Sequence, residues 1–239
     1  WLTYDAGAHG VGTDPDGYKG IASDGTYLYF VPYWNGTASH GEVLRYDRRG
    51  AFDVASSWAT YTPAANGVGN IAKGFEGAVF DGRYLYFVPN YAGFGPNAYH
   101  GEVLRYDTLA PFQTASSWTA FDPGSNGVGT DPDGYNGATF DGRYIYFAPT
   151  NNGTGPHGEV LMYDTTRPFN SAASWLTYDP GARGIGADPD GFAGTIFDNR
   201  YIYFVPDRNE TGVPGGEVLR YDTADGTFLG VFTPIHIIK

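Results

Sequence analysis

The chain has 239 residues, no cysteine, 17% aromatic residues and a formal net charge of −12. This charge repels phosphate backbones and anionic lipids, so it argues against nucleic acid and membrane surfaces as partners. The lack of cysteine excludes disulfides, thiolate metal sites and a cysteine nucleophile. No apolar run is long enough to cross a bilayer, so we expect no membrane insertion. Because the chain starts at Trp1, we interpret it as a processed secreted or extracellular protein, in preference to an excised domain or a partial chain.

One stretch recurs four times and organises the chain. Its clearest copy is Phe80-Asp-Gly-Arg-Tyr-Leu-Tyr-Phe-Val-Pro89, and its aspartate recurs as Asp24, Asp81, Asp141 and Asp198. These aspartates are 57, 60 and 57 residues apart. A fixed period of this size indicates a repeat architecture.

The second copy shows four strand-like segments in chain order. Residues 77–80 form an apolar run that ends at an Asp-Gly pair, a strong signal for a hairpin turn. Residues 84–88 follow as the second strand, which Pro89 stops because proline cannot donate to a sheet ladder. Residues 101–106 and 117–121 supply the third and fourth strands. Four short antiparallel strands in each repeat predict a β-propeller.

The fold class that we predict is all-β: a four-bladed β-propeller of four-stranded antiparallel blades. Residues 1–239 form a single domain, with repeats at about 1–57, 58–117, 118–174 and 175–228 and a terminal strand at 229–239. Five segments fit the fourth strand, namely 1–4, 58–61, 118–121, 175–178 and 229–232. We expect residues 1–4 to complete the last blade, which leaves one surplus outer strand at a terminus. That strand either stacks as an extra edge or pairs with another chain.

Propeller geometry places two kinds of loop on one face, which we call the loop-rich face: those between strands two and three, and those from one blade to the next. We expect function there. The blade-to-blade loops carry paired acids in three copies: Asp14 and Asp16, Asp131 and Asp133, and Asp188 and Asp190. Such pairs followed by glycine resemble the start of calcium-binding loops. The alternative is that Asp-Pro-Asp-Gly is favourable turn chemistry.

A His-Gly-Glu triplet opens the third strand in three copies. Its histidines are His40, His100 and His157, and the fourth copy has Gly215 instead. Three imidazoles at equivalent positions could ring a metal on the axis of the propeller. The alternative is that each histidine makes a hydrogen bond to a loop backbone.

The loops after the second strand carry aromatic residues and Asn-x-Thr triplets. Asn35, Asn152 and Asn209 are glycosylation acceptors on a eukaryotic or archaeal secretory route. Exposed aromatic rings beside Asn, Asp and Gly are typical of sugar-binding surfaces, although the same rings could cap the core. The candidate ligand-binding residues are Tyr33, Trp34, His40, Tyr91, Tyr99, His100, Asn152 and His157.

The repeat, with its Phe-Asp-Gly-Arg-Tyr, His-Gly-Glu-Val-Leu-Arg-Tyr-Asp and Ser-Ser-Trp segments, resembles a β-propeller repeat over the whole chain. In blade count it is similar to hemopexin-type propellers, and in its near-identical aromatic copies to tachylectin-like lectins. Neither motif matches residue by residue. The resemblance implies a propeller that binds a ligand or partner.

Three functions stay open from the sequence. The first is a secreted non-catalytic propeller that recognises glycans or an extracellular protein through repeated loops, because multivalent binders keep several similar sites. The second is a metal-dependent, polysaccharide-active enzyme that uses the three histidines. The third is a structural subunit that self-associates through the surplus terminal strand. Calcium is the one cofactor that the sequence suggests.

Overall fold

The structure is a computed structural model that describes residues 1–93, 95 and 98–224. These residues form four antiparallel sheets, or blades, each with its strands paired in chain order. Blades 1 and 2 contain β1 (Tyr18–Ser23), β2 (Tyr27–Pro32), β3 (Val43–Asp47), β4 (Trp58–Tyr61), β5 (Phe75–Phe80), β6 (Tyr84–Pro89), β7 (Val103–Asp107) and β8 (Trp118–Phe121). Blades 3 and 4 contain β9 (Tyr135–Phe140), β10 (Tyr144–Pro149), β11 (Val160–Asp164), β12 (Trp175–Tyr178), β13 (Phe192–Phe197), β14 (Tyr201–Pro206) and β15 (Leu219–Asp222).

The described helices are short 3-10 turns in two groups. One group precedes the outermost strand and the other opens the blade-to-blade loop. They are η2 (Ala55–Ser57), η5 (Ala115–Ser117) and η7 (Ala172–Ser174), then η1 (Gly7–His9), η3 (Ala64–Asn66), η6 (Gly124–Asn126) and η8 (Gly181–Arg183). Within the described ranges, none of these helices has the length and apolar character needed to span a membrane.

The recurring aspartate holds the inner hairpin together. Asp81 Oδ1 accepts the backbone N–H groups of Arg83 and Tyr84 at 2.8 and 2.7 Å. Its other oxygen accepts the hydroxyl of Tyr86 at 2.7 Å, and that tyrosine is buried. Gly82 adopts φ 103°, a conformation that glycine enters without a steric penalty. The motif that organises the sequence is therefore a structural turn.

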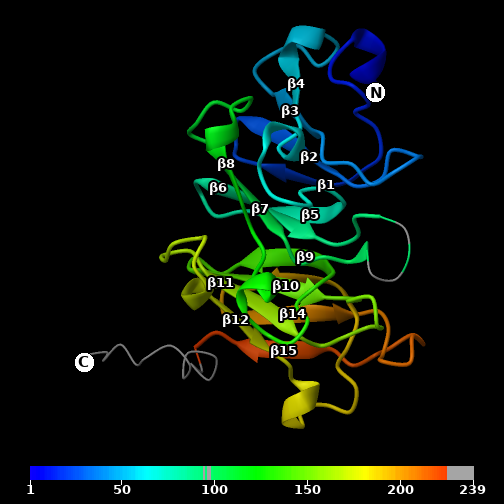
Figure 1. Cartoon of the computed structure of the whole chain (residues 1–239), viewed down its shortest axis with the longest axis vertical. Helices are drawn as coiled ribbons and strands as arrows, with labels where there is room; N and C mark the ends of the chain where they lie inside the picture. The colour runs from blue at the N-terminus through cyan, green and yellow to red at the C-terminus, as the bar shows by residue number, and fades with distance from the viewer. Residues whose placement is uncertain (94, 96–97, 225–239) are drawn as a thin grey trace.

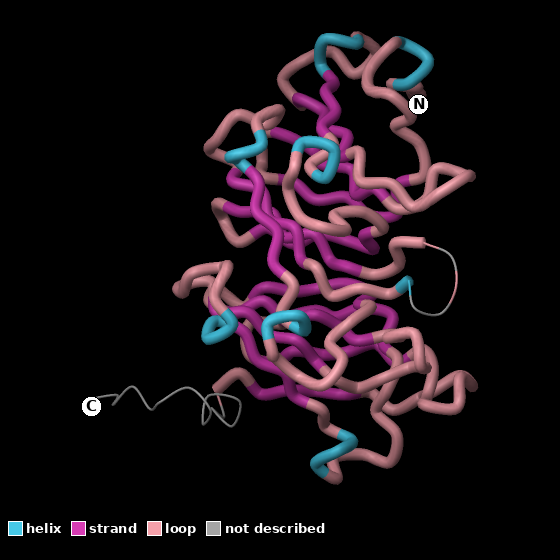
Figure 2. Tube along the Cα trace, viewed as in Figure 1, coloured by secondary structure: helices cyan, strands magenta, loops and turns pink. Residues whose placement is uncertain are grey.

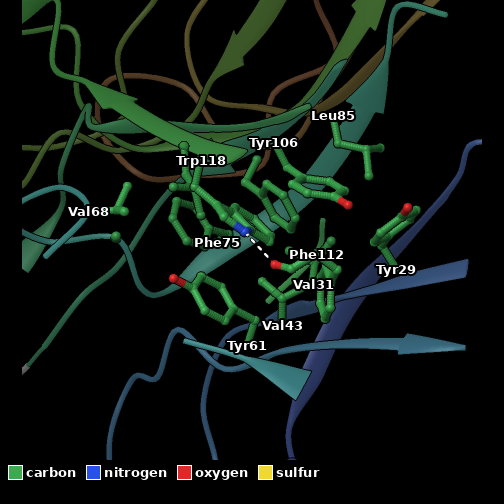
Figure 3. Packing of buried hydrophobic residues seen from close by; sticks show 13 residues of the cluster. Tyr29, Val31, Val43, Tyr61, Val68, Phe75, Leu85, Tyr106, Phe112 and Trp118 are labelled. Atoms are coloured by element: carbon green, nitrogen blue, oxygen red, sulfur yellow. Dashed lines mark hydrogen bonds between the residues drawn. The ribbon is translucent and has the colours of Figure 1, made fainter. Parts of the chain in front are cut away.

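Most of the hydrophobic core lies between neighbouring blades. Figure 3 shows the contact between blades 1 and 2, where Tyr61 at the end of β4 stacks on Trp118 at a centroid distance of 5.6 Å. The indole N–H of Trp118 donates to the carbonyl of Phe112 at 2.8 Å, so the buried ring leaves no polar atom unpaired. Each large side chain buried in this way contributes roughly 1.5–3 kcal/mol. The blades therefore stabilise one another.

The blades follow one another along the long axis of the molecule, from blade 1 at the top to blade 4 at the bottom (Figures 1 and 2). The inner strands pack in sequence, β1 on β5, β5 on β9 and β9 on β13. Glycine allows close approach at this point, because a Cβ on Gly20 would meet the Gly77 Cα at 3.0 Å. The prediction of an all-β fold of antiparallel blades is confirmed: blades 1 to 3 have four strands each, and blade 4 has three within the described residues.

Closure of the ring is not detected. Among the described residues, β1 and β13 do not pack on each other as the other successive inner strands do. The expectation that residues 1–4 complete the last blade is not confirmed either, because they form no strand and Tyr4 stacks on Trp58 of blade 1 at 5.5 Å. Residues 1–4 lie beside blade 1 at one end of the stack, whereas β15 lies at the other end, so they do not reach blade 4 (Figure 1). The terminal strand at 229–239 lies outside the described residues.

Candidate functional site

The glutamate of each His-Gly-Glu triplet fixes the blade-to-blade loop. Glu102 is buried, and its carboxylate accepts the backbone N–H groups of Asn70, Ile71 and Ala72, each at 2.8 Å. The other three glutamates each accept two such N–H groups: Glu42 from Thr13 and Asp14, Glu159 from Thr130 and Asp131, and Glu217 from Ala187 and Asp188. These carboxylates hold the loop-rich face in shape.

The three histidines do not form a ring. His40 lies edge-on against Tyr18, His100 against Phe75, and His157 against Tyr135, at centroid distances of 5.6, 5.9 and 5.9 Å. Burial lowers the pKa of each imidazole, that of His100 to about 4. Among the described residues, the one cluster of three or more potential metal ligands contains no histidine. The structure therefore gives the three-histidine metal site no support.

Each histidine instead belongs to a contact between blades. The Nε2 of His100 lies 2.9 Å from the carbonyl oxygen of Lys73, at hydrogen-bond distance. The histidine carbonyls accept N–H groups from the loops that lead into the next inner strand: His40 from Gly74, His100 from Gly134, and His157 from Gly191. The buried imidazole and the hydrogen bond to the histidine carbonyl thus both join one blade to the next.

The acidic pairs lie beside further carboxylates that the sequence did not single out. Asp131 and Asp133 share a cavity of about 270 Å³ with Asp122, which follows β8. In blade 4, carboxylate oxygens of Asp188, Asp190 and Glu210 all lie within 4.8 Å of one another. Each of these groups of carboxylates lies where a blade-to-blade loop meets a neighbouring segment of the chain.

Crowding of these carboxylates changes their proton affinity. Burial, followed by the charges of Asp131 and Asp122, raises the pKa of Asp133 to about 7. Burial is the largest cause that raises the pKa of Asp190 to about 6, and the negative charges of Asp188, Asp179 and Glu210 add to it. Like charges at close range disfavour ionisation unless a cation compensates them. The group of Asp188, Asp190 and Glu210, whose oxygens lie close together, could therefore hold a hard cation through oxygen ligands.

The second copy of the loop differs from the other three as a unit. Asp5, Asp122 and Asp179 stand nine residues before the first acid of each pair, and the second copy has Thr62 at that position. Its acidic pair is also replaced, by Ile71 and Lys73. A lysine thus stands where the other copies have the second aspartate. This joint loss was the signal in the sequence that could have identified the third aspartate.

A cluster of three tyrosines, Tyr33, Tyr91 and Tyr99, lies on the loop-rich face over blades 1 and 2, and all three are partly exposed. Tyr91 and Tyr99 meet edge to face at 5.0 Å, and the phenol groups of all three interact electrostatically. Partial burial, above all, raises the pKa of Tyr33 and Tyr99. Lys19 Nζ lies 4.3 Å from the centre of the Tyr33 ring and 2.6 Å from Glu76. The structure thus brings together three predicted binding residues and an ion pair that the sequence analysis missed.

The remaining predicted residues lie elsewhere in the same loops. Trp34 is half-buried next to Tyr33, and its backbone N–H donates to Gly17. In all three Asn-x-Thr triplets the threonine hydroxyl donates to the asparagine oxygen: Thr37 to Asn35, Thr154 to Asn152, and Thr211 to Asn209. A local turn bond therefore explains why threonine recurs, while glycosylation stays a prediction. Asn35 also donates to Asp14 at 2.6 Å, which ties this loop to an acidic pair.

Comparison with known proteins gives likeness only at the level of structure. No family model and no curated protein matches the chain. The chain is similar to the computationally designed Ika8 protein, with 8% identity and a TM-score of 0.47 over 87% of this chain and 46% of that one. It is similar to the computationally designed Ika4 protein, with 8% identity and a TM-score of 0.46 over 89% of this chain and 94% of that one. It is also similar to a putative 6-phosphogluconolactonase from Bacteroides uniformis, with 17% identity and a TM-score of 0.47 over 85% of this chain and 52% of that one. The chain thus spans about half the length of the first and third of these proteins, and likeness of this degree says nothing about its ligand.

Proposed function

We propose that this chain is a secreted, non-catalytic binding propeller that recognises a glycan through the tyrosine cluster. The observation that carries the proposal is the cluster itself: three partly exposed tyrosine rings from two neighbouring blades, with the Lys19–Glu76 ion pair beside them. Binding sites combine apolar surfaces with a few placed polar groups. Tyrosine supplies both, because its ring stacks on the C–H face of a sugar and its hydroxyl forms hydrogen bonds.

The charge of the chain favours a neutral ligand. A net charge of −12 disfavours anionic partners, whereas a polyhydroxylated neutral sugar has no charge to be repelled. Lys19 and Glu76 offer a donor and acceptors for sugar hydroxyls. The ligand class that fits best is therefore a neutral glycan.

Calcium is the cation that we assign to the acidic loops of this binding face. Calcium takes six to eight oxygen ligands, and Asp188, Asp190 and Glu210 offer carboxylate oxygens within 4.8 Å of one another. Burial, and then the charge of Asp188, raise the pKa of Asp190, and a bound cation would compensate that charge. Lys73 at the equivalent position of the second copy supplies a positive charge of its own. Bound calcium would stiffen the loops that carry these acids.

Glycan binding is tested first on a microarray of neutral and acidic glycans and then by calorimetric titration of the best ligand. Tyr99→Ala removes a ring of the cluster and should weaken binding at least about tenfold, as loss of an aromatic contact usually does. Tyr27→Ala is the matched control, because Tyr27 is a partly exposed tyrosine at the hairpin turn on the opposite face. No glycan binding, or equal loss in both variants, would overturn the proposal.

Calcium binding is tested separately by titrating calcium into the chelator-treated protein and following heat and melting temperature. We expect the melting temperature to rise with calcium, and Asp190→Asn to reduce the rise, because it removes a carboxylate from the cluster. Asp53→Asn, at an exposed acid away from the cluster, is the control. No heat and no change in melting temperature in millimolar calcium would contradict the assignment but leave glycan binding standing.

A further inference from the structure

A cavity of about 340 Å³ lies where the N-terminal segment packs on blade 1, at the end of the molecule marked N in Figure 1. Five aromatic side chains line it: Tyr4, Tyr18, Phe30, Phe52 and Trp58. Asp5 and Asp16 line it as well. Its volume is in the range of small-molecule sites, which is about 300–1,000 Å³. The cavity is separate from the tyrosine cluster, which lies over blades 1 and 2.

Ring packing holds the aromatic wall of this cavity in place. Tyr4 stacks between His9 and Trp58, at centroid distances of 4.6 and 5.5 Å. Phe52 meets Trp58 at 5.4 Å with the rings 68° apart, and Phe30 meets Trp58 at 5.8 Å and 35°. Rings inclined in this way present their surface from several directions, and the negative face of a ring attracts a cation. The wall therefore suits an apolar ligand body that carries a positive charge.

Carboxylates make the same cavity electrically negative. Asp5 and Asp16 are both exposed and reach it from the two ends of the blade-to-blade loop. Glu42 is buried below this loop. Burial, and then the charges of Glu42, Asp16 and Asp14, raise the pKa of Tyr18, so its hydroxyl stays protonated. A ligand with a positive charge and N–H donors would be attracted to Asp5 and Asp16, whereas an anion would be repelled.

Two hydroxyl groups around the cavity make no hydrogen bond within the part of the chain that the structure describes. They belong to Tyr4 and Tyr18, and both oxygen atoms are buried. Buried polar groups without partners are uncommon in proteins. Their place in the lining of a cavity with two carboxylates indicates a ligand that brings polar groups of its own.

The polar residues of the cavity are replaced together in the second copy of the repeat. Where the first copy has Asp5, Asp16 and Tyr18, the second has Thr62, Lys73 and Phe75. In blade 2 the equivalent wall packs against blade 1, where Phe75 belongs to one core cluster with Val31 and Val43. The two carboxylates and the hydroxyl are thus absent together where apolar side chains fill the space.

The third copy provides an internal comparison. It keeps the two acids as Asp122 and Asp133, and they line the cavity of about 270 Å³ in blade 3. No aromatic residue lines that cavity among the residues that the structure describes. Blade 1 is therefore the place where the acidic pair and an aromatic wall share one cavity.

We propose that the blade 1 cavity binds a small organic ammonium ion, with its charged head group at Asp5 and Asp16 and its apolar body against Phe30, Phe52 and Trp58. This site goes beyond glycan recognition and does not depend on it. The two carboxylates accept the N–H groups of the head group, and the rings cover the hydrocarbon part.

Calorimetric titration at pH 7 with 2-phenylethylammonium tests the proposal. Two related molecules separate the contributions: 2-phenylethanol has the same body without the charge, and ethylammonium has the head group without the ring. We expect one site for each chain, and binding at least about tenfold weaker for either related molecule. No saturable binding, or equal binding of the ammonium and the alcohol, would overturn the proposal.

Variants locate the site. Asp16→Asn should weaken binding of 2-phenylethylammonium about tenfold and leave that of 2-phenylethanol unchanged, because it removes a charge and keeps the shape. Tyr18→Phe, the residue that the second copy has, should weaken it about threefold. Asp133→Asn is the matched control in the blade 3 cavity and should change neither affinity. An equal loss in Asp16→Asn and Asp133→Asn would show general attraction to acidic loops and overturn the proposal.

Nuclear magnetic resonance of the indole N–H groups gives an independent readout. The indole of Trp58 donates to the carbonyl of Phe52 at 2.8 Å and lines the cavity, so its signal should shift and saturate with 2-phenylethylammonium. The signals of Trp118 and Trp175, which are buried between blades, should stay in place. Saturable binding that leaves the Trp58 signal unchanged would place the ligand elsewhere and overturn the assignment.

Discussion

The loop between blades 1 and 2 offers the sharpest test of how the loop-rich face is held. Glu102 is 3% exposed, and one carboxylate supports three consecutive backbone N–H groups. It also holds Ala72 at φ 28°, a conformation that residues other than glycine rarely adopt. Glu102→Ala removes these bonds from a buried carboxylate and leaves the N–H groups of Asn70, Ile71 and Ala72 without this acceptor, and of these three residues Ala72 is buried.

We expect Glu102→Ala to lower the free energy of unfolding by about 3–5 kcal/mol, because it removes three hydrogen bonds to a charged carboxylate, each worth about 1.5–3 kcal/mol, and water recovers part of the loss at the exposed donor. Glu217→Ala is the matched control, since Glu217 makes the same kind of bond to Ala187 and Asp188 at a more exposed loop. Water replaces that carboxylate, so its loss should matter much less.

Denaturant unfolding followed by tryptophan fluorescence gives the two free energies, and amide exchange shows where the change occurs. The amides of Ile71 and Ala72 should lose protection in Glu102→Ala. A loss smaller than about 1 kcal/mol, in the range of an ordinary surface substitution, would refute the reasoning. An equal loss in both variants would refute it as well.

Two further predictions concern pH, and their signs are opposite. Burial lowers the folded pKa of His100 to about 4, below its usual 6.5, so the free energy of unfolding should fall as pH drops from 6.5 to 4. His100→Gln should remove this part of the pH dependence, as measured by denaturant titrations at each pH. Burial and neighbouring acids raise the folded pKa of Asp133 to about 7, above its usual 3.8, so its contribution to stability should fall as pH rises from 4 to 7. Asp133→Asn should flatten that slope. Slopes that the substitutions leave unchanged would show that other groups control the pH dependence.

The strands could be predicted from the sequence because their signals are local. The Asp-Gly pair at Asp81, the run from Tyr84 to Val88 and the stop at Pro89 each report on neighbouring residues, and together they gave β6. Closure could not be predicted in this way, because it depends on the rotation between blades. That rotation depends on packing such as Tyr61 on Trp118, which no local pattern encodes.

The candidate site could be predicted only in part. The sequence indicated Tyr33, Tyr91 and Tyr99 as exposed rings, but their association depends on two blades meeting. The sequence also placed the three histidines at equivalent positions, which is correct. Equivalent positions in successive blades can nevertheless be too far apart to share one metal ion. His100 lies against Phe75 because burial of the imidazole there satisfies packing and one backbone bond.

Tyrosine ring signals in nuclear magnetic resonance, recorded while a neutral glycan selected from the array is added, test the proposed binding site most directly. Signals of Tyr33, Tyr91 and Tyr99 should shift and saturate together, because these rings form the proposed binding surface. The buried rings of Tyr29, Tyr86 and Tyr146 should stay unchanged. Saturable binding that leaves the three cluster signals in place would contradict the assignment of this face.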